Sequence, residues 1–226
     1  FAGNLGGTLL VSPRMPAAPV VLIIPGSGPT DRDGNNPLGI RASTYRLLAW
    51  ALAERNIASL RIDKRGMYSS ARAIRNPNAV TLNDYAADIE TWVRTIRAET
   101  GARQIWLLGH SEGGLVALAA ATLGTEASGL ILAATPGRPL GQVMRSQLCG
   151  NPANAPILDE AIAIIPSLEC GQPVDDAGMH AALKPLFRSE AQGFLIDLIA
   201  RDPARMLAQI SKPVLVIQGT KDLQVS

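Results

Sequence analysis

The fold is decided by the stretch QIWLLGHSEGGLVALAAATL, residues Gln104 to Leu123. Its apolar run Ile105 to Leu108 has the length and composition of a buried strand. The run leads through Gly109-His110-Ser111-Glu112-Gly113 into a segment so rich in Ala and Leu that we expect a helix buried on most sides. A strand, G-x-S-x-G and a helix, in this order, are typical of a tight turn that presents a nucleophilic serine.

Ser111 is the candidate nucleophile. In such a turn the serine has a strained backbone conformation, and the positions two before and two after it leave no room for a Cβ, which explains Gly109 and Gly113. Ser111 would project from the carboxyl edge of the sheet, and the N-terminus of the new helix would face a developing negative charge. The alternative interpretation is a purely structural turn.

Length and composition favour one large α/β domain over the 226 residues, with 47% hydrophobic residues for its core. The net charge is +2 and no basic run or aromatic-interleaved patch occurs, so we expect no nucleic-acid partner. No apolar run reaches the roughly eighteen residues that a membrane span needs. Because the chain begins with Phe1, we expect a processed or trimmed product, exported to the periplasm or outside the cell, although a cytoplasmic location stays open. The sequence indicates no oligomeric state.

The two cysteines, Cys149 and Cys170, lie in one Pro-rich, loop-like segment. In an exported protein they could form a disulfide, and in a cytosolic protein they would be small buried hydrophobes. The shared segment favours the disulfide. Neither cysteine has a histidine at metal-ligand spacing, so we expect no metal site.

Apolar strands alternate with helical patterns along most of the chain. The expected strands are Asn4–Val11 as an antiparallel edge, then Val20–Ile24, Ile57–Ile62, Ile105–Leu108, Leu130–Ala133 and Val214–Ile217. A turn is expected over Pro13–Pro19. This alternation predicts a mostly parallel, doubly wound sheet with helices on both faces, and ligands in such sheets bind at the carboxyl ends of the strands.

Two helices have recognisable ends. The first is expected from an N-cap at Ser43 to about Arg55, with Asn56 as its left-handed stop. The second is expected to open with a capping box between Thr81 and Asp84 and to end at Gly101. Its apolar face is more typical of the core than of a ligand platform; the residues are Tyr85, Ile89, Trp92, Val93 and Ile96.

The connection from about Thr135 to Ser211 is far longer than the others and shows no convincing strand. Short helical patterns cover Leu158–Ile165, Met179–Phe187 and Ala191–Ile199. Because a structureless loop of this size is uncommon, we expect 135–211 to form a helical cap inserted over the site. The alternative is a helical appendage packed elsewhere.

A nucleophilic serine needs a base, and the base needs an orienting acid. Asp222 follows the last expected strand, on the same sheet edge as Ser111 and after it in the chain, and is the candidate acid. The only histidines are His110, whose place beside Ser111 suits a pocket-lining role, and His180, which precedes Asp222. We therefore expect the base, with a final strand and helix, to lie in a C-terminal segment beyond these residues.

The turn Pro25-Gly26-Ser27-Gly28-Pro29 follows the second strand and suits an oxyanion hole. The expected donors are the backbone N–H groups of Ser27 and Glu112, with Gly26 and Gly28 allowing close approach. A phosphate-binding loop is excluded, because neither a Lys-Ser/Thr pair nor G-x-G-x-x-G spacing is present.

Asp31, Asp33 and Asn35 resemble the start of a calcium loop, but the sixth and twelfth positions are Asn36 and Ala42, where Gly and Glu are required. We instead expect Asp31, Arg32 and Asp33 to be ion-paired and to shape the oxyanion turn, and Asp63 to pair with Arg65 on the next loop. Solvated surface charge is the alternative for both.

Four segments together resemble the serine hydrolases of the α/β-hydrolase superfamily, in a bacterial group of carboxylesterases and serine-aminopeptidase-like hydrolases. They are PGSGPTDRDGN (Pro25–Asn35), DKRG (Asp63–Gly66), GHSEGG (Gly109–Gly114) and the G-x-x-D of Gly219–Asp222. The resemblance covers almost the whole chain. It implies Ser111 as nucleophile, Asp222 as triad acid, a cap between the sixth and seventh core strands, and a histidine past Asp222 that this sequence lacks.

The sequence thus predicts a serine esterase that needs no cofactor and acts on small-molecule esters through an acyl-enzyme on Ser111. An aminopeptidase or amidase is the alternative within the class, and it would use cap carboxylates to bind an ammonium group; the candidates are Glu160, Glu169, Asp175 and Asp176. An inactive binding protein with the same fold is the alternative from another class.

Overall fold

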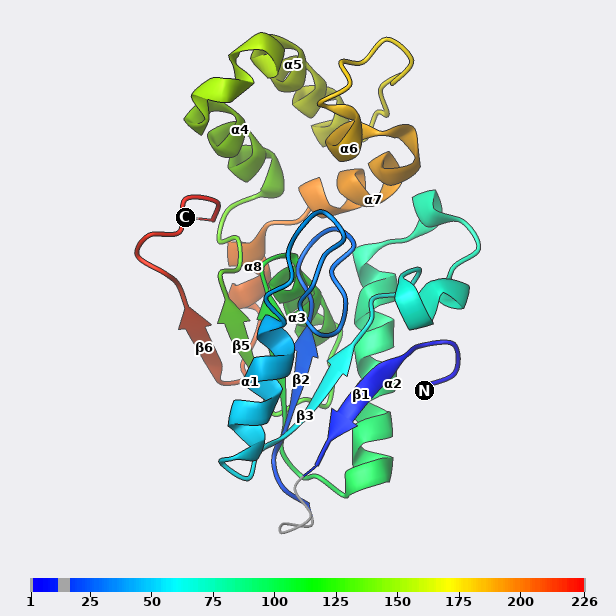
Figure 1. The fold of residues 1–226 in the computed structure, drawn as a ribbon, viewed down its shortest axis with the longest axis vertical. Coiled ribbons are helices and arrows are strands. Elements are labelled where there is room, and N and C mark those ends of the chain that lie inside the picture. The colour runs from blue at the N-terminus through cyan, green and yellow to red at the C-terminus, as the bar shows by residue number, and fades with distance from the viewer. Residues whose placement is uncertain (1, 12–16, 226) are drawn as a thin grey trace.

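The structure is a computed structural model that describes residues 2–11 and 17–225. The described residues form a six-stranded sheet in the order β1-β3-β2-β4-β5-β6, shown in Figure 1. The strands are β1 (Gly7–Leu10), β2 (Val20–Ile24), β3 (Ala58–Ile62), β4 (Ile105–His110), β5 (Gly129–Ala133) and β6 (Val214–Ile217). Only β1 is antiparallel to its neighbour β3. The predicted mostly parallel sheet with an antiparallel first edge is confirmed, while most of the turn predicted over Pro13–Pro19 lies outside the described residues.

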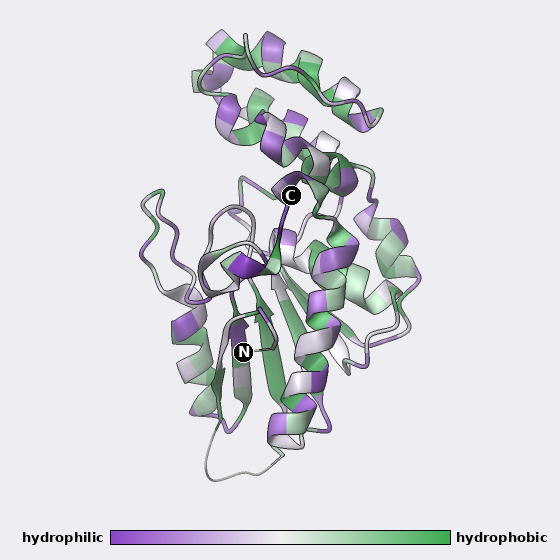
Figure 2. Ribbon diagram, turned by 90° about the vertical axis from the view of Figure 1, so that its right-hand side faces the viewer, coloured by the Kyte–Doolittle hydropathy of each residue, from purple (hydrophilic) through white to green (hydrophobic). Residues whose placement is uncertain are grey.

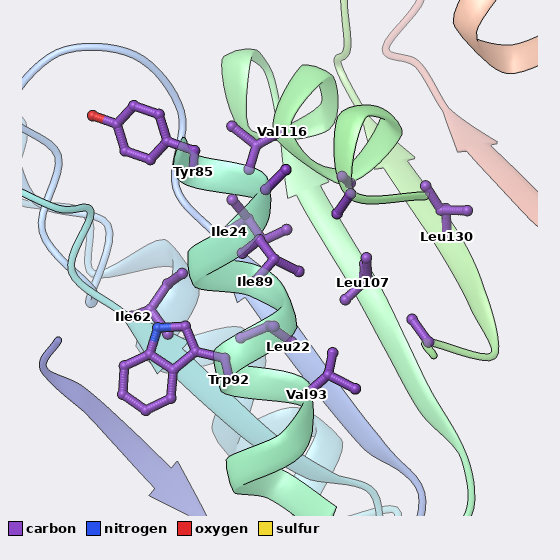
Figure 3. Packing of buried hydrophobic residues seen from close by; sticks show 14 of the residues in the cluster. Leu22, Ile24, Ile62, Tyr85, Ile89, Trp92, Val93, Leu107, Val116 and Leu130 are labelled. Atoms are coloured by element: carbon purple, nitrogen blue, oxygen red, sulfur yellow. The ribbon is translucent and has the colours of Figure 1, made fainter. Parts of the chain in front are cut away.

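Strand β2 is continuously apolar because helices cover both of its faces. Val21 and Ile23 pack against the side of α1 (Thr44–Ala53). Leu22 and Ile24 point to the opposite face and join the larger core under α2 (Leu82–Thr100) and α3 (Glu112–Thr122), as Figure 3 shows. The doubly wound arrangement follows from this alternation of side chains along the strand.

Helix α2 begins and ends where the sequence predicts. The Thr81 side chain accepts the N–H of Asp84, the Asp84 carboxylate accepts the N–H of Thr81, and Gly101 closes the helix with φ 65°. The five residues predicted for its apolar face are all buried, and four of them are labelled in Figure 3. Tyr85 and Trp92 therefore belong to the core, as predicted.

Helix α1 begins after Ser43, but Ser43 does not cap it. Ser43 has φ 48° and its side chain accepts no backbone N–H from the first turn of the helix, only Nη2 of the Arg46 side chain at 2.9 Å. Its N–H and its hydroxyl both lie within hydrogen-bond distance of Asn35 Oδ1, at 3.0 and 3.2 Å, so a loop contact replaces the predicted cap. The left-handed stop at Asn56 is confirmed by its φ of 59°.

Residues 140–199 form a separate group of helices beyond the carboxyl edge of the sheet (Figures 1 and 2). They are α4 (Leu140–Gly150), α5 (Leu158–Glu169), α6 (Lys184–Phe187) and α7 (Ser189–Ile199), and we call them the helical unit. The unit has its own apolar cluster around Phe187, Ile165 and Ala161. Helix α8 (Pro203–Ala208) then returns the chain to the sheet beside α3. As predicted, the described stretch between β5 and β6 contains no strand.

Short 3₁₀ helices fill three connections: η1 (Tyr68–Ala73), η2 (Pro77–Ala79) and η3 (Pro152–Ile157). In the part of the chain that is described, no helix combines the length and apolar character that crossing a bilayer requires.

Strand β6 lies at the far edge of the sheet and is poorly covered. Leu215, Val216 and Ile217 are 53%, 61% and 50% exposed. Helix α1 covers the middle of one face of the sheet, where it packs against β2 and β4, and it does not extend to β6. The expected further strand and helix beyond β6 stay a prediction.

Cys149 and Cys170 are both free and exposed, so the favoured disulfide is wrong for this structure. Glu169, next to Cys170, bonds Arg145 in the middle of α4, whereas Cys149 lies at the end of that helix. Four residues of helix separate Arg145 from Cys149, or about 6 Å along the axis. That offset, added to the separation between the two helices, exceeds the usual Cα spacing of a disulfide.

Candidate active site

The register of the sheet brings three chemically distinct residues to one level at its carboxyl edge. Ile23 pairs with Arg61 on β3, and Ile24 pairs with Gly109 on β4. Continuing both registers to Gly26 places Lys64 on one side of it and Ser111 on the other. The loops after three adjacent parallel strands therefore meet where the sequence predicts a site.

Ser111 occupies the predicted strained turn between β4 and α3. Its φ of 53° and ψ of −121° lie in a region that L residues rarely adopt. A Cβ on Gly109 would lie 2.5 Å from the Cα of Gly114, and one on Gly113 would lie 2.6 Å from the carbonyl oxygen of Pro25. Only glycine fits at these two positions, and the turn holds Ser111 at the edge of the sheet.

The Pro25–Pro29 turn packs directly against this serine. A Cβ on Gly26 would lie 3.4 Å from Ser111 Cβ and 3.1 Å from His110 Nδ1. The N–H groups of Ser27 and Glu112, the predicted donors, have no hydrogen-bond acceptor among the described residues. Gly28 has φ 66°, which glycine adopts without strain.

Tyr45, which the sequence analysis did not single out for the site, braces this turn from α1. Its buried hydroxyl accepts the N–H of Gly26 at 3.1 Å and lies 2.8 Å from His110 Nδ1. Burial lowers the pKa of His110, and the negative charge of Asp222 opposes that shift in part. His110 therefore lines the pocket as predicted, with Nδ1 engaged by Tyr45.

Lys64 was also missed, although it lies inside the DKRG segment. Its Nζ donates to the carbonyl oxygen of Gly26 at 2.7 Å and to Glu112 Oε1 at 3.0 Å. The side chains of Lys64 and Glu112 are only 3% and 14% exposed. No sequence signal pairs Lys64 with Gly26, because the contact depends on the register of β2 and β3, which only the structure gives.

Ion pairs hold the loop after β2, as predicted, but not with the predicted partners throughout. Arg32 bonds Asp63 through its backbone N–H at 2.9 Å and its Nε at 3.1 Å. Burial would raise the pKa of Asp63, but hydrogen bonds from Arg32 and Ser69 together lower it. Asp63 is therefore not the partner of Arg65, which corrects the sequence prediction.

Other charges near this loop are also paired. Arg65 bonds Asp88 on α2, with Nη2 2.6 Å from Oδ1. Asp33 pairs with Arg61 of β3, and Asp31 Oδ1 accepts the N–H groups of Asp33 and Asn35 at 2.8 Å each. Asp31, by contrast, makes no ion pair among the described residues and organises its own loop through these bonds, which corrects the prediction for this residue. Among the described residues no cluster of His, Cys, Asp and Glu could hold a metal ion.

Asp222 lies in a turn just after β6. Its Oδ1 accepts the N–H groups of Gln224 and Val225 at 2.9 and 3.0 Å, and its Oδ2 accepts Gln218 Nε2 at 2.9 Å. The backbone N–H groups of Val225 and Gln224 lower the pKa of Asp222. Asp222 follows β6 and Ser111 follows β4, so both lie at the carboxyl edge of the sheet, and the charges of Asp222 and His110 each influence the pKa of the other.

His180 is exposed in the segment between α5 and α6, which Figure 1 places on the outer side of the helical unit. Its Nδ1 accepts the N–H of Ala182 at 3.2 Å. Its backbone N–H binds Glu160 Oε1 at 3.0 Å. His180 is therefore not brought to Ser111.

Two cavities, each of about 340 Å³, meet at Ser27 and Ser111. The first, which we call the α1 cavity, is lined mainly by polar residue types, among them Thr30, Asn36, Tyr45 and His110. The second, which we call the α7 cavity because that helix supplies part of its wall, lies between the sheet edge and the helical unit. Its apolar wall includes Leu140, Val143, Met144, Leu186, Phe194 and Leu195.

This sheet topology, with a strained serine at the turn after β4, defines the class of the protein as an α/β-hydrolase. Residues 38–226 match the family described as "Serine aminopeptidase, S33", and the chain belongs to that family. The resemblance drawn from the sequence motifs is confirmed at this level.

Individual relatives agree with the fold. The chain is 27% identical over 233 residues to esterase EstD of Thermotoga maritima, covering 99% of this chain and 51% of that protein. It therefore spans about half the length of this curated relative. Est1E of Butyrivibrio proteoclasticus, solved with ferulic acid, has a TM-score of 0.62 and 17% identity, covering 98% of this chain and 77% of its own. A malate-bound esterase of Thermogutta terrifontis has a TM-score of 0.58 and 21% identity, and the match covers 97% of this chain and 76% of that chain.

Proposed function

We propose that this protein is a serine hydrolase that cleaves carboxylic esters through an acyl-enzyme on Ser111. The observation that carries the proposal is the position of Ser111, strained at the junction of two cavities, with two neighbouring backbone N–H groups, of Ser27 and Glu112, that have no acceptor among the described residues. One cavity can hold the acyl group and the other the alcohol. The esterase activity of relatives with this fold supports the same chemistry.

The mechanism begins with attack of Ser111 Oγ on the ester carbonyl carbon, while a base takes the hydroxyl proton. The carbonyl oxygen becomes an oxyanion, which the N–H groups of Ser27 and Glu112 bind at the N-terminus of α3. The C–O bond to the alcohol then breaks and the alcohol leaves with the proton from the base. Water repeats the sequence on the acyl-enzyme and releases the carboxylic acid.

Asp222 is the proposed orienting acid, and the base is a histidine from outside these 226 residues. Neither histidine of the chain serves, because His110 Nδ1 is bound to Tyr45 and His180 is exposed on the helical unit. The lowered pKa of Asp222 keeps its carboxylate ionised at neutral pH, as an acid that stabilises an imidazolium must be.

Esters are favoured over peptides with a free amino terminus. An aminopeptidase needs an available carboxylate near the scissile bond. Among the described residues, the only acidic one in the wall of either cavity is Glu112, which is bound to Lys64. The four predicted candidates in the helical unit are used elsewhere. Glu169 pairs with Arg145, and Glu160, Asp175 and Asp176 accept the N–H groups of His180, Ala177 and Ser189.

The helical unit is the proposed cap. Its apolar side chains form one wall of the α7 cavity, and Ser111 forms part of the other. We therefore assign the acyl chain to the α7 cavity and the alcohol to the more polar α1 cavity. An acyl group of short to medium length suits a cavity of about 340 Å³.

The test is hydrolysis of p-nitrophenyl butyrate and octanoate by the natural full-length chain, with labelling of Ser111 by a fluorophosphonate. Ser111→Ala should lower kcat by at least about 1,000-fold and abolish labelling. Ser146→Ala is the matched control, because that exposed hydroxyl bonds only the backbone of its own helix, at Gln142. A full-length chain that neither hydrolyses esters nor labels would leave the inactive binding protein as the better interpretation.

A further inference from the structure

Lys64 is a buried cation in the wall of the α7 cavity, beside Ser111, and the mechanism above gives it no role. Burying an ammonium group is costly unless it is paired and hydrogen-bonded. Lys64 meets this need with two acceptors, the carbonyl oxygen of Gly26 and the carboxylate of Glu112. Each acceptor belongs to a segment that supplies one of the two oxyanion donors.

The bond to Gly26 fixes the direction of the first donor. The Gly26 carbonyl and the Ser27 N–H belong to the same trans peptide, in which C=O and N–H point in opposite directions. Holding the oxygen toward Lys64 therefore aims the Ser27 N–H away from Lys64. Ser111 lies on the opposite side of Gly26 from Lys64, where the strand registers place it. A cation on the carbonyl oxygen also polarises the peptide and makes its N–H a stronger donor.

The bond to Glu112 acts on the second donor. Glu112 is the first residue of α3, and its own N–H is the second donor of the proposed oxyanion hole. Its carboxylate would by itself oppose negative charge on a substrate oxygen nearby. Lys64 offsets that charge and ties the start of α3 to the oxyanion turn.

We propose that Lys64 is a positioning residue that joins the Gly26–Ser27 peptide to the first residue of α3, so that both backbone donors face the substrate oxygen before it becomes charged. This role rests on the proposed esterase function. It makes the Lys64–Glu112 pair part of the oxyanion hole through the two backbone donors that the pair positions.

The test compares Lys64→Met, Glu112→Gln and the double variant in the natural full-length chain. Lys64→Met should lower kcat about 100-fold with KM changed less than about 3-fold, because the donors matter mainly in the transition state. Glu112→Gln keeps the bond from Lys64 to Gly26 but removes the ion pair with Lys64, so it should lower kcat by about 3-fold, less than Lys64→Met does. Lys64→Met/Glu112→Gln should regain about 10-fold over Lys64→Met, because no uncompensated carboxylate remains beside the oxyanion.

A trifluoromethyl ketone adds a readout that a purely structural role would not move. This inhibitor forms a tetrahedral, negatively charged adduct with Ser111, so its Ki should rise with the loss of kcat/KM in each variant. Lys64→Arg retains the charge and should recover most of the activity. The matched control is Arg65→Met/Asp88→Asn, which removes the neighbouring ion pair of the same loop and should lower Tm but leave kcat unchanged.

The outcomes separate this inference from the proposed function. If wild type is active and Lys64→Met has the same kcat, the role of Lys64 is overturned but the proposed function is not. The same holds if the double variant is no faster than Lys64→Met. If Lys64→Met does not fold, the double variant, which leaves no unpaired charge, is compared with Glu112→Gln and should still be about 3-fold slower. A wild type that is inactive and unlabelled removes the proposed function and this inference with it.

Discussion

At the scale of single residues, Gly113 shows how little space the turn around Ser111 allows. A Cβ at this position would overlap the carbonyl oxygen of Ile24 and lie 2.6 Å from that of Pro25. Both contacts are with backbone, which cannot move without shifting β2 and the oxyanion turn. Gly113→Ala should therefore lower the free energy of unfolding by about 1–3 kcal/mol and reduce ester hydrolysis, measured by urea denaturation and a p-nitrophenyl ester assay.

The control is Gly150→Ala at the end of α4, where a Cβ would meet no heavy atom within 4 Å. Because alanine favours helix over glycine, this change should leave stability equal or raise it by up to about 1 kcal/mol. Similar losses of unfolding free energy in both variants would show that the close contacts of Gly113 do not explain the destabilisation in Gly113→Ala.

His110 makes stability depend on pH. Burial holds the folded-state pKa of His110 below its ordinary value of 6.5, so the unfolded chain binds more protons between the two values. The stabilising contribution of neutral His110 is complete above 6.5 and is lost as pH falls through the folded-state pKa. The free energy of unfolding of wild type should thus fall between about pH 7.5 and 5, measured by urea titration.

His110→Gln keeps a polar partner for Tyr45 but does not titrate. Its free energy of unfolding should change less than that of wild type over the same pH range. Parallel curves for the two proteins would assign the pH dependence to other groups, such as the buried carboxylates.

At the scale of elements, the DKRG segment shows what the sequence could and could not predict. Its place after β3, beside the turn after β2, followed from the alternation of strands and helices. The partners of its three charged residues could not be predicted in this way. Asp63 binds Arg32, Lys64 binds Gly26 and Arg65 binds Asp88, so each residue reaches a different segment. Those choices depend on register and side-chain direction, which spacing along the chain does not encode.

The ends of the helices give the same lesson. The capping box of α2 is local, involves only Thr81 and Asp84, and was predicted correctly. The start of α1 depends on Asn35 from another part of the loop, so Ser43 looked like a cap and is not one. Ser111 and Gly109 were predictable for the same reason as α2, because their constraints lie within a few residues. Gly113 was predicted from the motif, although the atoms that exclude a Cβ there belong to Ile24 and Pro25. Tyr45 and Lys64 were missed because their role comes from contacts between distant segments.

The helical unit should set the acyl-chain preference through α6. Leu186 is 41% exposed and lines the α7 cavity, so a larger side chain can enter the cavity without disturbing the core. Leu186→Trp should lower kcat/KM for octanoate about 10-fold while leaving acetate nearly unchanged, which corresponds to about 1.4 kcal/mol of lost transition-state binding. The assay is a series of p-nitrophenyl esters of increasing acyl length.

The matched control is Leu47→Trp, at a position on α1 that is 53% exposed and is not part of either cavity wall. It should leave the chain-length profile unchanged. Equal effects on all esters in Leu186→Trp would place the acyl chain outside the α7 cavity.

At the scale of the whole molecule, the hydrophobic residues fall into clusters that belong to different parts of the chain. The largest lies between the sheet and helices α2 and α3, and another lies within the helical unit. Leu140 packs against both, at the point where the chain leaves the sheet. Since Ser111 belongs to the sheet and much of the apolar cavity wall to the helical unit, the proposed site depends on two regions that can differ in stability.

Phe187→Ala should separate the stability of these two regions. Phe187 is fully buried in the cluster of the helical unit, and its loss leaves a cavity that costs about 3–5 kcal/mol. Hydrogen exchange should then show lost protection in α4 to α7, while β2 and β4 stay protected. Hydrolysis of octanoate should fall more than that of acetate, because the wall of the α7 cavity loosens but the Ser111 turn does not.

Leu22→Ala, in the cluster under the sheet, should instead lower protection throughout. Equal loss in both regions for Phe187→Ala would mean that the helical unit and the sheet unfold as one cooperative unit, and that the proposed cap has no independent mobility.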